Sequence, residues 1–211
     1  VNCFEVWMCS WWLADEWTRR WKGYQGLGSY NLENAWKLDR LLDLADANDQ
    51  YVHLVIDNHG KAAQILRNNK GQCDHEWEDS PYNQENAADG GFLRLAIDLF
   101  SHPQVRESYK DRYRHLAGRW GWSTRIYGWE LWSELDLVGH RYGRHRDLYA
   151  SPAVREWHRE MAGWLHFWDQ GKRPITTHYS GDYTYIDTAM IAQPCIEYIV
   201  CDAYHAADKR L

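Results

Sequence analysis

The sequence predicts an α/β protein in which parallel β-strands are connected by helices. Short apolar runs rich in β-branched residues alternate along the chain with longer segments whose apolar residues recur at helical spacing. This alternation favours a parallel sheet with helical crossovers. A chain of 211 residues can bury one sizeable core, and no composition shift marks a domain boundary inside it.

The first half of the chain contains two expected strands and the helix between them. The strands cover residues 1–8 and 51–56, and a loop rich in Trp and Gly follows the first. Asn31 is a suitable N-cap for the helix, because apolar residues recur after it at helical spacing. The polar segment 61–91 is expected to be a long loop, which inside a domain is usually functional or disordered.

The second half contains three expected strands. Helical spacing predicts one helix that stops before Pro103, a second that Pro103 opens and a third that Pro152 opens. Residues 126–132 form an apolar run typical of a buried strand, and residues 174–180 and 195–201 are the last two expected strands.

Composition narrows the function classes. The net charge is -6 and no Lys/Arg stripe occurs, which argues against a nucleic-acid partner. No run approaches the roughly 20 apolar residues of a membrane span. The five Cys residues include no CxxC pair, so neither a disulfide framework nor a zinc knuckle is indicated. The 14 Trp and 14 Tyr suit stacking on sugar rings, although they also suit an ordinary core.

The most informative motif is the strand at residues 126–132, because it delivers Glu134 into the loop beyond its C-terminal end. Catalytic groups of α/β barrels lie at that position. The segment Trp129-Glu130-Leu131-Trp132-Ser133-Glu134 resembles the WELWNE signature on the fourth strand of clan A glycoside hydrolases, which include the family 5 cellulases and mannanases. In those enzymes the last Glu is the acid/base catalyst.

Other landmarks follow the order of that family. Residues 1–8 resemble the second strand, residues 55–60 the third strand with its His, and residues 200–204 the sixth, where the family has His-x-Tyr. The resemblance implies a (β/α)₈ TIM-barrel that is incomplete in this chain. Residues 1–211 would be a single domain that lacks the first strand and the last two.

The resemblance also implies a reaction, the hydrolysis of a β-linked polysaccharide or oligosaccharide by a retaining mechanism with Glu134 as acid/base. Such enzymes use two carboxyl groups about 5–5.5 Å apart, and the family nucleophile lies on the seventh strand, which this chain does not supply. No cofactor or metal is implied. The substrate contacts are expected from Trp7, His59, Trp132, Ser133, Asp202 and Tyr204.

Three positions depart from the family pattern: Glu5 replaces Arg, Ser133 replaces Asn and Asp202 replaces His. Glu5 places a negative charge beside carboxylates and should raise their pKa values. These departures motivate an alternative, a non-catalytic carbohydrate-binding barrel with a degenerate site. A third possibility is a structural fragment that further segments complete. Strand alternation assigns Glu130 to another layer of the barrel, where a structural ion pair is expected.

The remaining motifs say less about function. Asp74-His75-Glu76 and the pair His140 and His145 offer metal-ligand residue types without a recognised spacing, so solvated loop residues are expected. The chain opens on Val1 without a signal peptide, which leaves the compartment undecided. The family resemblance favours a secreted or periplasmic protein.

Overall fold

The computed structural model describes residues 2–64, 76–139, 145–181 and 183–202. Strands β1 (Cys3–Trp7), β2 (Tyr51–Val55), β3 (Ile126–Glu130) and β4 (Ile175–Thr176) form one parallel sheet in chain order. Strand β5 (His178–Ser180) pairs in parallel with β6 (Val200–Asp202). The predicted parallel sheet is confirmed, and its order is that of consecutive barrel strands.

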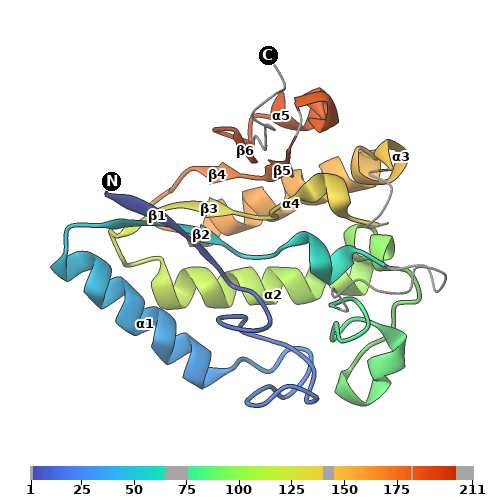
Figure 1. The fold of residues 1–211 in the computed structure, drawn as a ribbon, viewed down its shortest axis with the longest axis horizontal. Helices are drawn as coiled ribbons and strands as arrows, with labels where there is room; N and C mark the ends of the chain where they lie inside the picture. The colour runs from blue at the N-terminus through green and yellow to red at the C-terminus, as the bar shows by residue number, and fades with distance from the viewer. Residues whose placement is uncertain (1, 65–75, 140–144, 182, 203–211) are drawn as a thin grey trace, which may run out of the picture.

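Three long helices connect these strands and cover one face of the sheet (Figure 1). Helix α1 (Leu32–Ala47) joins β1 to β2, α2 (Pro103–Trp120) joins β2 to β3, and α4 (Pro152–Trp168) joins β3 to β4. Within the described ranges, none of the helices combines the length and the apolar character that crossing a bilayer requires.

Short helical turns fill the connections. They are η1 (His59–Ala62), η2 (Gln84–Asp89), η3 (Ala96–Phe100), η4 (Leu135–Leu137), α3 (Arg146–Tyr149), η5 (Tyr183–Tyr185) and α5 (Thr188–Ile191).

The helix starts follow from local sequence. The Asn31 side chain accepts hydrogen bonds from the backbone N–H groups of Glu33 (3.0 Å) and Asn34 (3.1 Å), which satisfies two free donors of α1. Pro103 and Pro152 lie in the first turns of α2 and α4, where a missing N–H costs nothing. The three predicted helix starts are therefore confirmed.

Three predicted elements differ from the structure. The helix expected before Pro103 is only the short turn η3, and the last strand is confined to Val200–Asp202. The strand expected at residues 174–180 is divided at Thr177, whose hydroxyl donates to the carbonyl of Trp132 (2.9 Å), as does the N–H of His178 (2.9 Å). The chain bends there to follow the segment after β3.

The two faces of the sheet differ in polarity. Alternate residues such as Val6, Val52 and Leu54 face the helices and belong to the main core. The opposite, inner face carries Glu5 and the buried side chains of His53, Glu130 and His178 in place of the bulky apolar residues usual in barrel interiors. This polar inner layer lies directly below the strand ends.

Candidate active site

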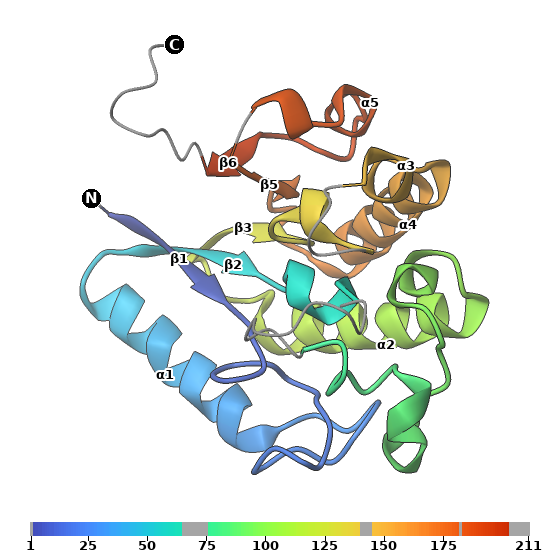
Figure 2. The ribbon, with the colours of Figure 1, turned by 45° about the vertical axis from the view of Figure 1, so that its right-hand side comes forward.

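The turns after β2 and β3 lie side by side beyond the strand ends (Figure 2). Ser133 donates its N–H to the carbonyl of Asp57 (2.8 Å), and Asn58 and Ser133 form a parallel β-bridge. This pairing brings His59 and Glu134 together, with 2.7 Å between Nδ1 of His59 and Oε2 of Glu134. Each side chain is 14% exposed, so the pair is enclosed but open to small molecules. The predicted acid/base and the predicted cleft histidine are thus neighbours.

The backbone of Glu134 is left-handed, with φ 53° and ψ 49°. A non-glycine residue is uncommon in this region, and such conformations cost about 1–3 kcal/mol. The Glu134 carbonyl accepts from the N–H of Leu137 (3.0 Å), so η4 holds this conformation. Strain of this kind clusters at functional sites, where a side chain must point in one direction.

Glu76 supplies a second carboxyl group beside His59. Its side chain is buried, and a Cβ built on Gly60 would lie 2.5 Å from the Glu76 carboxyl carbon, so the two residues are in close contact. Burial raises the pKa of Glu76 to about 7, although the charges of His59 and Lys61 oppose the rise. The expectation of a solvated Glu76 is wrong, because this residue packs under the turn that carries His59.

A buried ion cluster fixes the strand ends from below. Arg112 of α2 contacts Asp57 (Nη1 to Oδ2, 2.7 Å) and donates from Nε to Asp15 (2.8 Å). Lys61 lies 2.9 Å from the other oxygen of Asp57 and 3.9 Å from Glu16. All five side chains are almost fully buried, so the cluster ties the loop after β1, the turn after β2 and α2 into one unit.

Ser133 is fully buried and its hydroxyl lies 2.7 Å from Nδ1 of His178. Nε2 of His178 lies 3.3 Å from Oδ2 of Asp202, whose side chain is 36% exposed. Ser133 therefore points into the barrel interior, and its predicted contact with substrate is wrong for this conformation because the side chain has no accessible surface. Asp202 lies at the exposed end of this Ser-His-Asp chain.

Glu130 lies between two imidazoles of the inner layer. Its carboxylate oxygens are 3.3 Å from Nε2 of His53 and 3.5 Å from Nδ1 of His178. Burial raises the pKa of Glu130 to about 7, and the charge of Glu5 adds to the rise, as the sequence predicted. Glu130 thus lies on the inner layer between two histidines.

The pKa values of the two histidines beside Glu130 shift in opposite directions. Burial lowers the pKa of His53 to about 4, and the charge of His178 adds to this. Burial also disfavours charge on His178, but the contact with Glu130 and the charge of Asp202 outweigh it and raise the pKa of His178.

Within the described part of the chain, one group of side chains could hold a cation. Ligand atoms of Glu5, Glu130 and His178 all lie within 4.8 Å of one another, and carboxylate and imidazole donors suit zinc. The indole N–H of Trp7 already donates to a carboxylate oxygen of Glu5. Each of the other two residues is also engaged, Glu130 with His53 and His178 with Ser133 and Asp202.

The other predicted substrate residues differ in position. Trp7 is partly exposed on the inner face, beside Glu5. Trp132 is fully buried, with ring centroids 4.8 Å from Phe100 and 5.7 Å from Trp157, so it is a core residue and its predicted sugar contact is wrong. Tyr204 lies outside the described residues.

Sequence reasoning missed three residues of the site: His53, Glu76 and His178. Strand alternation offers a signal for His53, because it shares a sheet face with Glu5 and Glu130. The sequence feature that relates to Glu76 is Gly60, 16 residues earlier, because its missing Cβ leaves room for the carboxyl group.

Comparison with solved structures identifies the fold. The chain superposes on an exo-β-1,4-mannosidase from Opitutaceae bacterium strain TAV5 with a TM-score of 0.60 at 18% identity, covering 95% of this chain and 31% of that one. A β-galactosidase from Rahnella sp. R3 gives 0.57 at 15% identity, covering 96% of this chain and 34% of that one. The chain therefore has the fold of a partial (β/α)₈ barrel.

A family 1 β-glucosidase from Thermotoga maritima gives a TM-score of 0.52 at 14% identity, with coverage of 87% and 34%. The chain therefore spans about a third of the length of these neighbours, as an incomplete barrel. No protein-family model and no curated protein sequence matches it.

Proposed function

We propose that the protein carrying this chain is a retaining glycoside hydrolase, similar to family 5, that acts on a β-linked polysaccharide or oligosaccharide. The contact between Glu134 and His59 at the strand ends carries the proposal, because it places a carboxyl group and an imidazole where barrel enzymes carry catalytic groups. The neighbouring structures support it, since their names describe a mannosidase, a β-galactosidase and a β-glucosidase.

In the proposed mechanism Glu134 protonates the oxygen of the leaving sugar and later removes a proton from the attacking water. His59, with Nδ1 2.7 Å from the carboxyl group, fixes its orientation, and Glu76 beneath His59 adds a buried proton-binding group. The nucleophile is a second carboxylate about 5–5.5 Å from the first. This chain corresponds to about the second to the sixth strand of the barrel. We assign the nucleophile to a strand outside it.

Replacement of Glu134 by glutamine in the full-length protein tests the proposal. Hydrolysis of β-glucans, mannans and xylans should fall by about 10²–10⁴-fold, the usual contribution of a general acid. An aryl glycoside with a good leaving group should lose less, because its oxygen needs no proton. Glu156→Gln, an exposed position on α4, provides the matched control. Unchanged hydrolysis by Glu134→Gln would remove Glu134 from the mechanism.

The second candidate function is a non-catalytic carbohydrate-binding barrel. The position of Ser133 favours it, because this hydroxyl is buried against His178 where the family carries an amide in the cleft. Calorimetry with oligosaccharides and chromatography of the same mixtures separate the two functions. Binding without any released product would favour the binding module, and measurable turnover would exclude it.

A further inference from the structure

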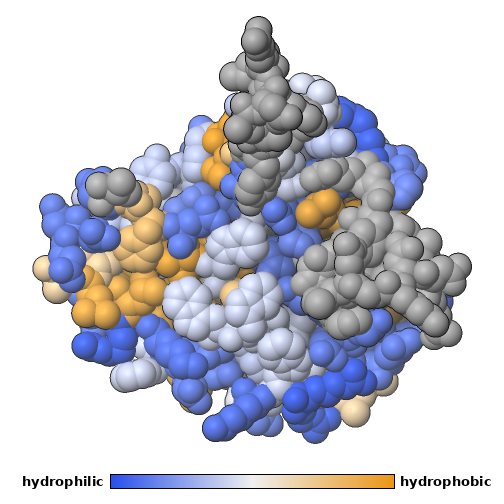
Figure 3. Space-filling model, in the orientation of Figure 1, coloured by the Kyte–Doolittle hydropathy of each residue, from blue (hydrophilic) through white to orange (hydrophobic). Residues whose placement is uncertain are grey.

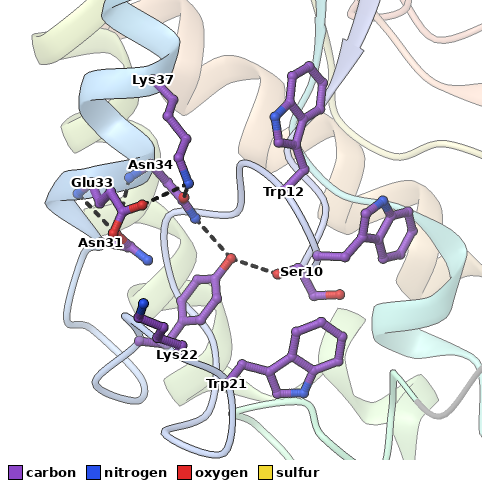
Figure 4. A pocket seen from close by; sticks show the side chains of 10 residues that line it. Ser10, Trp12, Trp21, Lys22, Asn31, Glu33, Asn34 and Lys37 are labelled. Carbon is purple, nitrogen blue, oxygen red and sulfur yellow. Dashed lines mark hydrogen bonds and ion pairs between the residues drawn. The ribbon is translucent and has the colours of Figure 1, made fainter.

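A second pocket lies beside the N-terminal end of α1, in the loop that follows β1. It is a cavity of about 270 Å³, just below the roughly 300–1,000 Å³ of typical ligand sites, and has room for a small ligand. The indole rings of Trp11, Trp12 and Trp21 form one side. Figure 4 shows Trp12 and Trp21 across the pocket from the polar side chains of α1 and its cap.

Two of these indoles are exposed without an evident structural role. Trp11 is 59% and Trp12 47% exposed, and neither packs in the hydrophobic clusters of the described residues. Side chains of intermediate hydropathy, as Trp and Tyr are, gather in the middle of this face (Figure 3). Adjacent exposed indoles are costly to keep in water and mark binding surfaces.

The loop that carries the indoles is held in place. Trp21 packs on a small core formed by Ala14, Trp17 and Tyr24, and its indole N–H donates to Asp79 (3.0 Å). The Tyr24 hydroxyl donates to the carbonyl of Ser10 (2.7 Å). A preformed aromatic wall loses little entropy when a ligand binds.

The polar side of the pocket offers hydrogen-bonding side chains, and its charged members are Lys22, Lys37 and Glu33. The hydroxyl of Ser10 is buried at the pocket wall and has no hydrogen-bond partner among the described residues. Asn31 already occupies the N–H groups of Glu33 and Asn34, and the Glu33 carboxylate engages Lys37 at 3.1 Å. The helix N–H donors are therefore already taken, so the side chains of this wall provide its hydrogen bonds.

We propose that this pocket binds a neutral sugar ring, as an accessory carbohydrate site separate from Glu134. A pyranose presents apolar C–H faces to indole rings and hydroxyl groups to polar side chains, which matches the two walls of the pocket. The polar side chains of the opposite wall, such as Lys22 and Asn31, can hydrogen-bond to its hydroxyl groups. The inference does not depend on hydrolysis at Glu134.

Affinity gel electrophoresis of the full-length protein in soluble glucomannan, β-glucan and xylan tests the site. Glu134→Gln serves as the background so that the polymers stay intact. We expect retardation by at least one polymer, and we expect Trp11→Ala or Trp12→Ala to weaken it about tenfold, equivalent to ~1.4 kcal/mol for a lost ring. Trp122→Ala, which removes a 67% exposed indole just beyond the end of α2, should leave it unchanged.

Hydrolysis provides an independent readout. With Glu134 intact, Trp12→Ala should leave kcat/KM for a short aryl glycoside unchanged and lower it for a polymer. Absence of retardation by every polymer, or equal loss in Trp122→Ala, would overturn the accessory site. Retardation that needs Trp11 and Trp12 in a protein without hydrolytic activity would uphold the site and remove only the proposed enzyme function.

Discussion

Replacement of Glu130 by glutamine should raise the stability of the variant relative to the parent protein as the pH increases. Burial raises the pKa of this carboxyl group from an ordinary value of 4.5 to about 7. The folded protein therefore binds one more proton than the unfolded chain between these pH values. The stability that Glu130 contributes is fully present below pH 4.5 and is lost as pH rises through 7. At 1.36 kcal/mol per pH unit, the loss is about 3 kcal/mol.

Glutamine has nearly the shape of the protonated carboxyl group and cannot ionise. The difference in unfolding free energy between Glu130→Gln and the parent should thus shift by about 3 kcal/mol in favour of the variant between pH 4 and pH 8. His178, whose raised pKa also gives stability that is lost as pH rises, leaves the sign unchanged.

Urea unfolding at half-unit pH intervals measures this difference, provided that the slope with denaturant stays the same. Glu156→Gln removes the same charge from an exposed position on α4 and should give a curve parallel to the parent. A constant difference between Glu130→Gln and the parent across this pH range would refute the reasoning, because it would mean that Glu130 titrates alike in the folded and unfolded states.

Two further predictions concern the supports of the site. Arg112→Met should lower the free energy of unfolding by about 3–5 kcal/mol in a urea titration, because it removes the cation that contacts buried Asp15 and leaves Asp57 with Lys61 alone. Gly60→Ala should displace the Glu76 carboxyl group and lower kcat on a glycoside substrate, since the new Cβ would lie within 2.5 Å of it. Gly163→Ala, in open space on α4, should instead leave kcat unchanged and stabilise the protein by about 0.5–1 kcal/mol, and the reverse order of the two alanine variants would contradict this packing argument.

The helices and the strand before Glu134 could be predicted because their signals are local. Asn31 caps α1 through two bonds within three residues, and Pro103 fixes the first turn of α2. The apolar run that ends at Glu130 requires burial whatever packs on it. Each of these signals can be recognised without knowing the rest of the chain.

The remaining features depend on contacts between distant segments. Trp132 was misplaced because the motif resemblance does not show where its side chain points: β3 ends at Glu130, and the indole of Trp132 packs in the core. The partner of Ser133 is His178, 45 residues later, and no sequence pattern around either residue indicates the contact. Glu76 contacts Gly60, 16 residues earlier in the chain, and no pattern around Glu76 indicates that contact.

The left-handed backbone of Glu134 means that stability and the proposed chemistry favour different residues at this position. Glycine adopts this conformation without strain, so Glu134→Gly would relax the turn while removing the carboxyl group. Variants selected only for thermal resistance would therefore drift toward loss of the acid at this position. Selection for stability alone would not maintain a glutamate here. Its retention among related chains would therefore be a direct sign of chemistry.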